Sequence, residues 1–562
     1  METELSRRNF LKGTAVIGVG GLLGANLAGC AEDVAPTPIG PNIDWDYEAD
    51  IVVLGAGDGG LFAATFAARA GASVLLLEKA REEDSGGNSR VAGNMWTIAT
   101  DATEGMKYYL SAAEKDIDKD YLTALVDSGT NHLNNEWLPS FPDMSIERFP
   151  IFSPEFDALP GGDVIKAWQN GGASKSQLWL ALEKGCKAEE NVEFMYETPG
   201  KRLITNTDGM VIGVVAENAG AEINVKAKKA VILGVGGYEF NPNMIKNSYP
   251  GWPVFSRGTP YNTGDGIAMA QKVGAQLWHM NASDSGSGAM RVPGLNYGHG
   301  AYDSDDVPAN VSLNSPNDNR NRFFFVDKYG KRFMSENRPD GHGYGRREYL
   351  FFYDGVECLW PRLPYWNIFD QTEAENGPVG AGANPNSTFS WFTYASGYTW
   401  SADNSAEVEK GWILKADTIE ELAEKMTAAQ ADERKHLFRD GIVVDPAVLR
   451  KTLDDYNAYC RAGNDPDFGR NPNFMVPLEG PFYAFRVYPN QYNTQGGPKR
   501  NTKAQTLDAF DEPIPHLYSI GECGAGYAWV YNGGWNIAEA MITGHWAAEN
   551  AVLETPWDEP VE

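Results

Sequence analysis

The chain has 562 residues, with 47 Lys plus Arg against 76 Asp plus Glu and a formal net charge of −29. A surface this acidic repels phosphate backbones, so we expect no nucleic-acid partner. Apolar residues make up 42% of the chain, which excludes wholesale disorder. Five cysteines without a CxxC pair predict neither a disulfide framework nor a metal site.

The first thirty residues have the pattern of an export signal. Arg7 and Arg8 form a twin-arginine pair, and the glycine-rich run 13–28 that follows is too short and too weakly apolar to span a membrane. The run ends in Leu-Ala-Gly-Cys, which resembles the lipobox of bacterial lipoproteins and predicts lipidation at Cys30. We therefore expect a membrane-anchored lipoprotein at the cell surface or periplasmic face. A plain cleaved signal, with Cys30 incidental, is the alternative.

A dinucleotide-binding pattern begins after a proline-containing linker. An apolar strand over 50–54 leads into Gly55-Ala56-Gly57-Asp58-Gly59-Gly60, a small-residue helix over 61–70 and a second strand that ends at Glu78. In this context the first glycine permits a tight turn, the second lets backbone amides approach a diphosphate, and the third lets the helix lie close to the sheet. Glu78 stands where an acid accepts a hydrogen bond from a ribose hydroxyl.

Further glycine-rich strand ends are widely separated along the chain. One covers 231–237, about 150 residues beyond the second strand, and another, 517–522, lies near the C-terminus and precedes a helix-like segment after Gly534. A flavin domain assembled from three distant segments explains this spread, whereas an NAD domain would be contiguous. The pattern favours FAD.

Four more motifs appear in a characteristic order: Thr263-Gly264-Asp265-Gly266, Gly330-Lys331-Arg332-Phe333 with Glu336, Thr494-Gln495-Gly496-Gly497, and Gly521-Glu522. With them the chain from 48 to 553 resembles the flavoprotein superfamily of soluble fumarate reductases and 3-ketosteroid Δ1-dehydrogenases. The resemblance implies an α/β fold, in which a Rossmann-like FAD-binding domain assembled from discontinuous segments carries an inserted α+β cap domain. The expected divisions are a signal (1–30), a linker (31–47), the FAD-binding domain (48–260 and 475–553), the cap (261–474) and a tail (554–562).

The resemblance also implies which residues hold the FAD. They are Gly55, Ala56, Gly57, Gly60, Glu78, Lys79, Asn88, Ser89, Asp265, Asn493, Glu522 and Ile537. Asn88 stands where the succinate dehydrogenase branch has the histidine that carries covalent FAD. We therefore expect non-covalent FAD.

The substrate end departs from the fumarate reductases. Those enzymes hold dicarboxylates with arginine and histidine, because buried carboxylates need charged partners. Here the histidine position is Tyr492-Asn493, no arginine occurs in 369–373, and the residues before the last glycine pair are Tyr531 and Asn532. Ketosteroid dehydrogenases instead have a tyrosine before that pair, whose hydroxyl polarises a ketone. Tyr531, or Asn532 in a gap-free alignment, takes its place, and we expect Tyr492, Asn532 and Gly534 to line the substrate site.

Candidates for proton transfer lie just after the motif Gly330-Lys331-Arg332-Phe333. They are Glu336, His342 and Tyr344, with Arg338 competing if the substrate is anionic. The aromatic run 391–400 suits either a flat apolar ligand stacked over the flavin or a tightly packed core.

Together these features predict an extracytoplasmic FAD-dependent oxidoreductase that reduces or introduces a C=C bond next to a carbonyl, with hydride passing through flavin N5. Its partners are expected to be a small unsaturated substrate and a membrane-linked quinol pathway or cytochrome. A respiratory reductase of a carboxylated alkene, of fumarate or acrylate type, is the alternative. A non-catalytic electron carrier is disfavoured, because a large inserted cap would cover the flavin edge that a carrier exposes.

Overall fold

The computed structural model describes residues 43–113, 117–150, 154–171, 176–251, 254–256, 258–296, 308–313, 321–336, 349–381, 400–431, 442–526 and 531–558. The predicted signal, Cys30, Arg338, His342, Tyr344 and nearly all of the aromatic run lie outside these residues.

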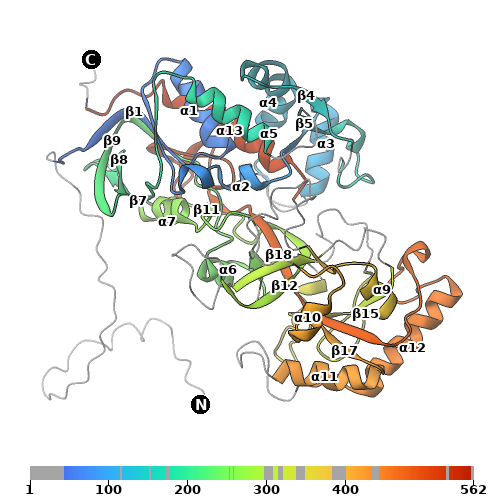
Figure 1. The fold of residues 1–562 in the computed structure, drawn as a ribbon. Coiled ribbons are helices and arrows are strands. Elements are labelled where there is room, and N and C mark those ends of the chain that lie inside the picture. The colour runs from blue at the N-terminus through green and yellow to red at the C-terminus, as the bar shows by residue number, and fades with distance from the viewer. Residues whose placement is uncertain are drawn as a thin grey trace, which may run out of the picture. The chain divides into compact units, whose positions relative to one another are not determined.

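The first sheet is built around parallel strands (Figure 1). β1 pairs in parallel with β2 and β9, β2 with β6, and β9 with β21. Ile51 and Val53 face one buried cluster and Val52 and Leu54 another, so β1 is covered on both faces, as parallel strands usually are. The strands are β1 (Tyr47–Leu54), β2 (Val74–Leu77), β6 (Val192–Met195), β7 (Gly200–Thr205), β8 (Val211–Asn218), β9 (Ala221–Leu233), β20 (Gln505–Leu507) and β21 (Pro513–Ser519).

Helices and a small antiparallel sheet complete this part of the fold. β5 lies between β3 and β4, and β11 pairs with β19. The elements are α1 (Asp58–Arg69), α2 (Gly87–Val91), β3 (Met95–Ala99), α3 (Ala102–Ala113), α4 (Lys119–Ser128), β4 (Ile146–Arg148), β5 (Ile165–Asn170), α5 (Gln177–Lys187), α6 (Pro242–Ser248), α7 (Asp265–Lys272), β11 (Leu277–Trp278), β19 (Gly497–Pro498) and α13 (Trp535–Ala551). The strand–turn–helix–strand pattern of the dinucleotide motif is confirmed, with the helix beginning three residues before its predicted start, at Asp58.

Helices α1 and α13 lie side by side and approach each other at two glycines (Figure 1). A Cβ atom on Gly544 would overlap the carbonyl oxygen of Gly59, and one on Gly59 would lie 2.9 Å from the carbonyl oxygen of Ala540. Because neither glycine has a side chain, the two backbones can pack this closely. This contact joins the start of the dinucleotide motif to the last helix of the chain.

The second sheet is centred on the long strand β18, which pairs with β10, β12, β15 and β17. One face packs aromatic side chains such as Phe325, Tyr365 and Phe485, and α11 and α12 cover the other face. The elements are β10 (Phe255–Ser256), β12 (Ser283–Asn296), β13 (Pro308–Leu313), β14 (Phe323–Val326), β15 (Tyr365–Asp370), α9 (Gln371–Glu375), β16 (Gly380–Ala381), α10 (Ser405–Glu409), β17 (Leu414–Ala416), α11 (Ile419–Ala431), α12 (Pro446–Ala462) and β18 (Phe482–Thr494).

Side chains cap the start of helix α11. The backbone N–H of Glu421 donates to the Thr418 hydroxyl at 3.2 Å, and the Glu421 carboxylate accepts from the N–H of Asp417 at 3.2 Å. The domain boundaries stay a prediction. By its hydrogen bonds β18 belongs to the second sheet, and the chain returns to the first sheet at β20.

The glycine contact generates a stability prediction. Gly544→Ala should lower the free energy of unfolding by about 1–3 kcal/mol, because the added methyl group overpacks the contact between α1 and α13. Gly355→Ala is the control, since a Cβ there meets nothing within 4 Å. Urea unfolding followed by circular dichroism measures both, and equal stability of the two variants would contradict the role given to this contact.

Candidate functional site

The turn after β1 has room only for glycine at two of its predicted positions. Gly55 has φ +96°, and a Cβ on it would overlap the carbonyl oxygen of Gly234 at the end of β9. A Cβ on Gly60 would in turn overlap the carbonyl oxygen of Gly55. Gly57 precedes the first turn of α1 and has no side-chain cap. A helix end of this kind binds a diphosphate through its backbone N–H groups, of which that of Asp58 donates to the Ser89 hydroxyl at 2.9 Å in this structure.

Glu78 ties the end of β2 to this turn. Its Oε2 accepts a hydrogen bond from the N–H of Ala56 at 2.8 Å, and its Oε1 accepts one from the N–H of Ala80 at 2.8 Å. Burial raises the pKa of Glu78, and the two backbone N–H groups oppose that rise. Each carboxylate oxygen keeps a second lone pair, so the predicted bond from a ribose hydroxyl remains chemically available.

Lys79 and Asp265 are brought together from β2 and α7. The ammonium group of Lys79 donates to Asp265 Oδ2 at 2.8 Å and also to the Thr263 hydroxyl at 2.6 Å. This ion pair joins two of the predicted cofactor residues across the sheet edge. Their direct contact with a cofactor stays a prediction.

Asn88 lies between two carboxyl groups. Its Nδ2 donates to Glu239 Oε1 at 2.7 Å and to Glu522 Oε2 at 3.3 Å, while its Oδ1 accepts from the N–H of Thr259. Burial, followed by repulsion from Glu522, raises the pKa of Glu239 to about 8. Burial also raises the pKa of Glu522 to about 7. Neighbouring Ser89 accepts a hydrogen bond from the N–H of Asp58 at 2.9 Å.

Sequence reasoning missed Glu239. The residue follows the glycine-rich end of β9, in Gly236-Gly237-Tyr238-Glu239, and that placement was the available signal.

The two alternative substrate residues before α13 point to different neighbours. The Tyr531 hydroxyl donates to Asn536 Oδ1 at 3.2 Å, and Asn536 Nδ2 donates to Glu522 Oε1 at 2.6 Å. Asn532 is 1% exposed, and its Nδ2 donates to the hydroxyl of Tyr108 in α3 at 3.0 Å. Tyr531 is thus linked to the acids around Asn88, whereas Asn532 is enclosed in the first part of the fold.

Other predicted residues gather in the same region. Gly534 starts α13 with φ +80°, and a Cβ there would lie 2.9 Å from Thr97 Oγ1, so the turn accepts only glycine. Ile537 is buried on α13. The backbone oxygen of Tyr492 accepts from Asn88 Nδ2 at 3.3 Å, and Asn493 Oδ1 accepts from Gln495 Nε2.

Glu336 lies in a network of buried charges within the cap. Its two oxygens accept from Arg332 at 2.9 Å each, and Arg470 also donates to it at 3.2 Å. Asp465 pairs with Arg332 at 3.0 Å. Ion pairing of a fully buried carboxylate explains the presence of Glu336, and its part in proton transfer stays a prediction.

A second buried ion pair, which the sequence did not indicate, supports α13. Arg500 and Glu539 are 2.7 Å apart, and the Tyr121 hydroxyl donates to Glu539 Oε1 at 2.6 Å. Arg500 also donates to the carbonyl oxygen of Gly521 at 3.0 Å. The network therefore fixes the strand end that carries Glu522.

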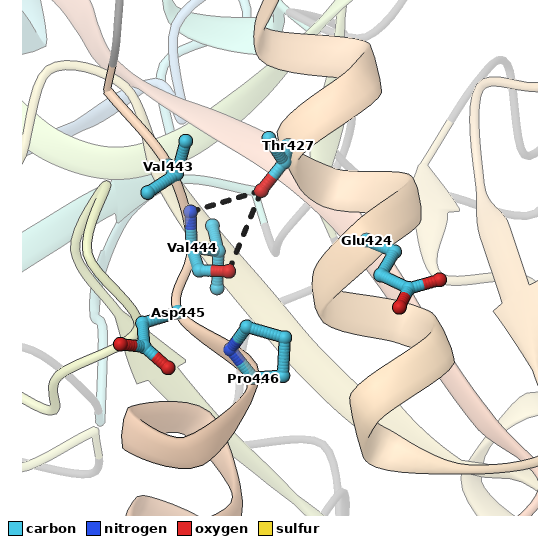
Figure 2. Close-up of a pocket in the computed structure, with 6 residues that line it drawn as sticks. All are labelled: Glu424, Thr427, Val443, Val444, Asp445 and Pro446. Atoms are coloured by element: carbon cyan, nitrogen blue, oxygen red, sulfur yellow. Dashed lines mark hydrogen bonds between the residues drawn. The ribbon is translucent and has the colours of Figure 1, made fainter.

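A surface hollow of about 460 Å³ lies elsewhere, between α11 and α12 (Figure 2). The Thr427 hydroxyl accepts from the N–H of Val444 and donates to its carbonyl oxygen, which closes the wall between the two segments. None of its lining residues belongs to the predicted site. Within the described ranges no cluster of three or more His, Cys, Asp or Glu is arranged to hold a metal ion.

The arrangement fits a dinucleotide cofactor. The carboxyl ends of β1, β2, β9 and β21 are adjacent in the sheet, and they carry Gly55, Glu78, the 234–239 segment and Glu522. Ligands of open parallel sheets bind at this edge, and the glycine turn leaves the backbone open to a diphosphate.

Comparison with known proteins gives matches over most of the chain. A family described as FAD binding domain matches residues 50–536, and a twin-arginine translocation pathway signal sequence matches residues 4–24. The digoxin reductase of Eggerthella lenta is 25% identical over 99% of this chain and 99% of its own. The vinyl phenol reductase of Lactiplantibacillus plantarum is 28% identical over 85% of this chain and 90% of its own.

A solved structure supports the fold alone. It is the 3-ketosteroid delta1-dehydrogenase from Sterolibacterium denitrificans in complex with 1,4-androstadiene-3,17-dione, which aligns with a TM-score of 0.68 at 22% identity, covering 90% of this chain and 99% of that one.

The position of Glu78 generates a prediction about cofactor affinity. Glu78→Gln should weaken FAD binding by about 10- to 100-fold, because a hydrogen bond to a charged group contributes roughly 1.5–3 kcal/mol. Fluorescence titration of protein stripped of flavin by acid measures the dissociation constant. Glu82→Gln, at an exposed carboxylate that pairs with Lys187, should bind like the unchanged protein. Equal affinities for all three proteins would show that Glu78 does not support the cofactor.

Proposed function

Because the chain belongs to the FAD binding domain family, we propose that this FAD-dependent oxidoreductase reduces or introduces a C=C bond next to a carbonyl outside the cytoplasmic membrane. The family match and the relatives confirm the predicted kinship, the α/β fold and FAD as cofactor. Bound FAD supplies the hydride chemistry at its N5 atom. The protein's own residues bind the substrate, orient it and transfer a proton to or from it.

The position of Tyr531 carries the proposal. Its hydroxyl is linked through Asn536 to Glu522, next to the predicted flavin residues, whereas Asn532 is turned to Tyr108. A phenol at this place can donate to the carbonyl oxygen of an enone and stabilise the charge that develops there. The names of two relatives, a digoxin reductase and a vinyl phenol reductase, support reduction of an unsaturated substrate.

The second proton-handling group is proposed from the residues that follow Glu336. His342 and Tyr344 are the candidates for a neutral substrate and Arg338 for an anionic one, and all three lie outside the described residues. Glu336 stays a further candidate for this step, with its two oxygens paired with arginines in the structure.

Non-covalent attachment of FAD is also proposed. The Asn88 amide holds Glu239 and Glu522 and provides no nucleophile comparable to a histidine ring. Acid denaturation of the protein should therefore release chemically intact FAD.

Export and anchoring are separate matters. The twin-arginine signal supports export by the twin-arginine route. We propose that lipidation at Cys30 then anchors the protein and that electrons are exchanged with a quinol pathway or a cytochrome in anaerobic respiration. In the part of the chain that the structure covers, no helix is long and apolar enough to cross a membrane.

A rate measurement tests Tyr531. Tyr531→Phe should slow reoxidation of the dithionite-reduced flavin about 10²- to 10³-fold, or roughly 2.7–4 kcal/mol, because one oxyanion-type donor is lost while the shape is conserved. Stopped-flow absorbance measures the rate with 1,4-androstadiene-3,17-dione, cyclohex-2-enone, 4-vinylphenol and fumarate as probes. Tyr492→Phe controls for loss of another hydroxyl and should have a smaller effect. An unaffected Tyr531→Phe together with loss of turnover in Arg338→Met would instead indicate a carboxylated substrate.

Cell fractionation tests the location. Replacing Arg7 and Arg8 by Lys should keep the chain in the cytoplasm, and Cys30→Ala should release the exported protein from the membrane. Stable anchoring needs more than one acyl chain, since a single chain binds with K on the order of 10⁴ M⁻¹. Membrane retention of Cys30→Ala at the unchanged level would exclude lipidation as the anchor.

A further inference from the structure

A continuous hydrogen-bonded path runs from Tyr531 into the buried acids. Tyr531 donates to the oxygen of the Asn536 amide at 3.2 Å, and the nitrogen of the same amide donates to Glu522 at 2.6 Å. Asn536 is 9% exposed, so water has little access to its amide. The path continues from Glu522 through Asn88 to Glu239.

The orientation of the Asn536 amide follows from the charge of its neighbour. An ionised carboxylate can only accept hydrogen bonds, so the amide nitrogen must face Glu522 and the amide oxygen must face Tyr531. In this arrangement the proton of the Tyr531 hydroxyl points at Asn536. A substrate carbonyl would have to compete for that proton.

Protonation of Glu522 permits the opposite arrangement. The carboxyl O–H can then donate to the amide oxygen, and half a turn about the last side-chain bond of Asn536 presents its N–H group to the Tyr531 oxygen. The Tyr531 proton is thereby turned toward another acceptor. In both arrangements the Asn536 amide keeps its hydrogen bonds to Glu522 and to Tyr531, so it can switch between them without losing either bond.

We propose that Asn536 is a positioning residue whose amide turns the Tyr531 hydroxyl toward or away from a substrate carbonyl according to whether Glu522 carries a proton. The proposal rests on the role proposed above for Tyr531. It assigns a function to Asn536, which neither the sequence motifs nor the comparisons identify.

The surroundings of Glu522 favour a proton near neutral pH. Burial raises its pKa to about 7, although the amides of Asn536 and Asn88 oppose the rise. The charged and titratable groups that face it come from α1, the segment after β9, α13 and the segment after β19: Asp58, Glu239, Glu539 and Arg500. Three of these are acids, and Arg500 is already paired with Glu539 at 2.7 Å.

Two substitutions of Asn536 should have opposite effects. In the unchanged protein the rate of flavin reoxidation should fall about 10-fold from pH 6 to pH 8, because Glu522 ionises with a pKa of about 7. Asn536→Leu removes the acceptor for Tyr531 and should keep a rate that changes less than about 2-fold over this range. Asn536→Asp presents only acceptors once both carboxyl groups are ionised and should be slow at pH 8. Cyclohex-2-enone, which has a carbonyl oxygen for Tyr531, serves as the probe.

The matched control is Asn550→Leu, the same change on the same helix, at a side chain that donates only to the carbonyl oxygen of Trp546. It should keep the 10-fold fall. A purely structural role of Asn536 predicts that the Leu and Asp variants lose rate alike and keep the fall with pH. That result would overturn the proposal.

A spectroscopic measurement needs no substrate. In FAD-loaded protein with ¹³C at the phenol carbon of tyrosine, the Tyr531 resonance, identified by its absence in Tyr531→Phe, should shift with a midpoint near pH 7. The shift should vanish in Asn536→Leu. A resonance that does not move in the unchanged protein refutes the switch. Unimpaired turnover in Tyr531→Phe would refute the proposed function instead, so the two failures are distinguishable.

Discussion

The close approach of α1 and α13 holds together two segments from opposite ends of the chain. Gly59 and Gly544 let the backbones meet, and the helix that starts beside the diphosphate turn thereby lies against the helix that follows Tyr531. The diphosphate turn and the segment that carries Tyr531 consequently depend on one packing contact. A side chain at either glycine would disturb both, because neither helix could move alone.

Buried charge is handled differently in the two parts of the structure. In the cap, Glu336 is neutralised by Arg332 and Arg470. On the last helix, α13, Glu539 is neutralised by Arg500. Such pairs cost much to break, which makes them rigid supports. The acids around Asn88 are instead joined by amides. Amides can reverse their donor and acceptor ends, so this region can change its proton content without changing its packing.

The sequence predicted those features whose causes are local. Gly60 is required by a contact with the carbonyl oxygen of Gly55 within the same turn. Local pattern also placed the parallel strands, since each is a short apolar run next to glycines. A single sequence contains these causes directly, so no partner from elsewhere in the chain has to be known.

The missed features depend on partners that are distant along the chain. Glu239 matters because Asn88, 151 positions away, reaches it. The choice between Tyr531 and Asn532 could not follow from periodicity, since both precede the helix in an irregular segment, and only Tyr108 shows which one is enclosed. Glu336 has a second arginine neighbour, Arg470, which is 134 positions away and could not be inferred from the motif that contains Arg332.

The strand β18 has a consequence for how such proteins can exchange parts. Residues 482–487 pair with β15 in the cap sheet, whereas Gln491 and Thr494 of the same strand bond to the segment that carries Glu239. One unbroken strand therefore serves both the cap and the cofactor side. The cap is therefore not an interchangeable module. Recombination that exchanged the whole cap sheet would also exchange β18, and with it residues that contact the segment of Glu239. Substrate range and cofactor environment would be inherited together.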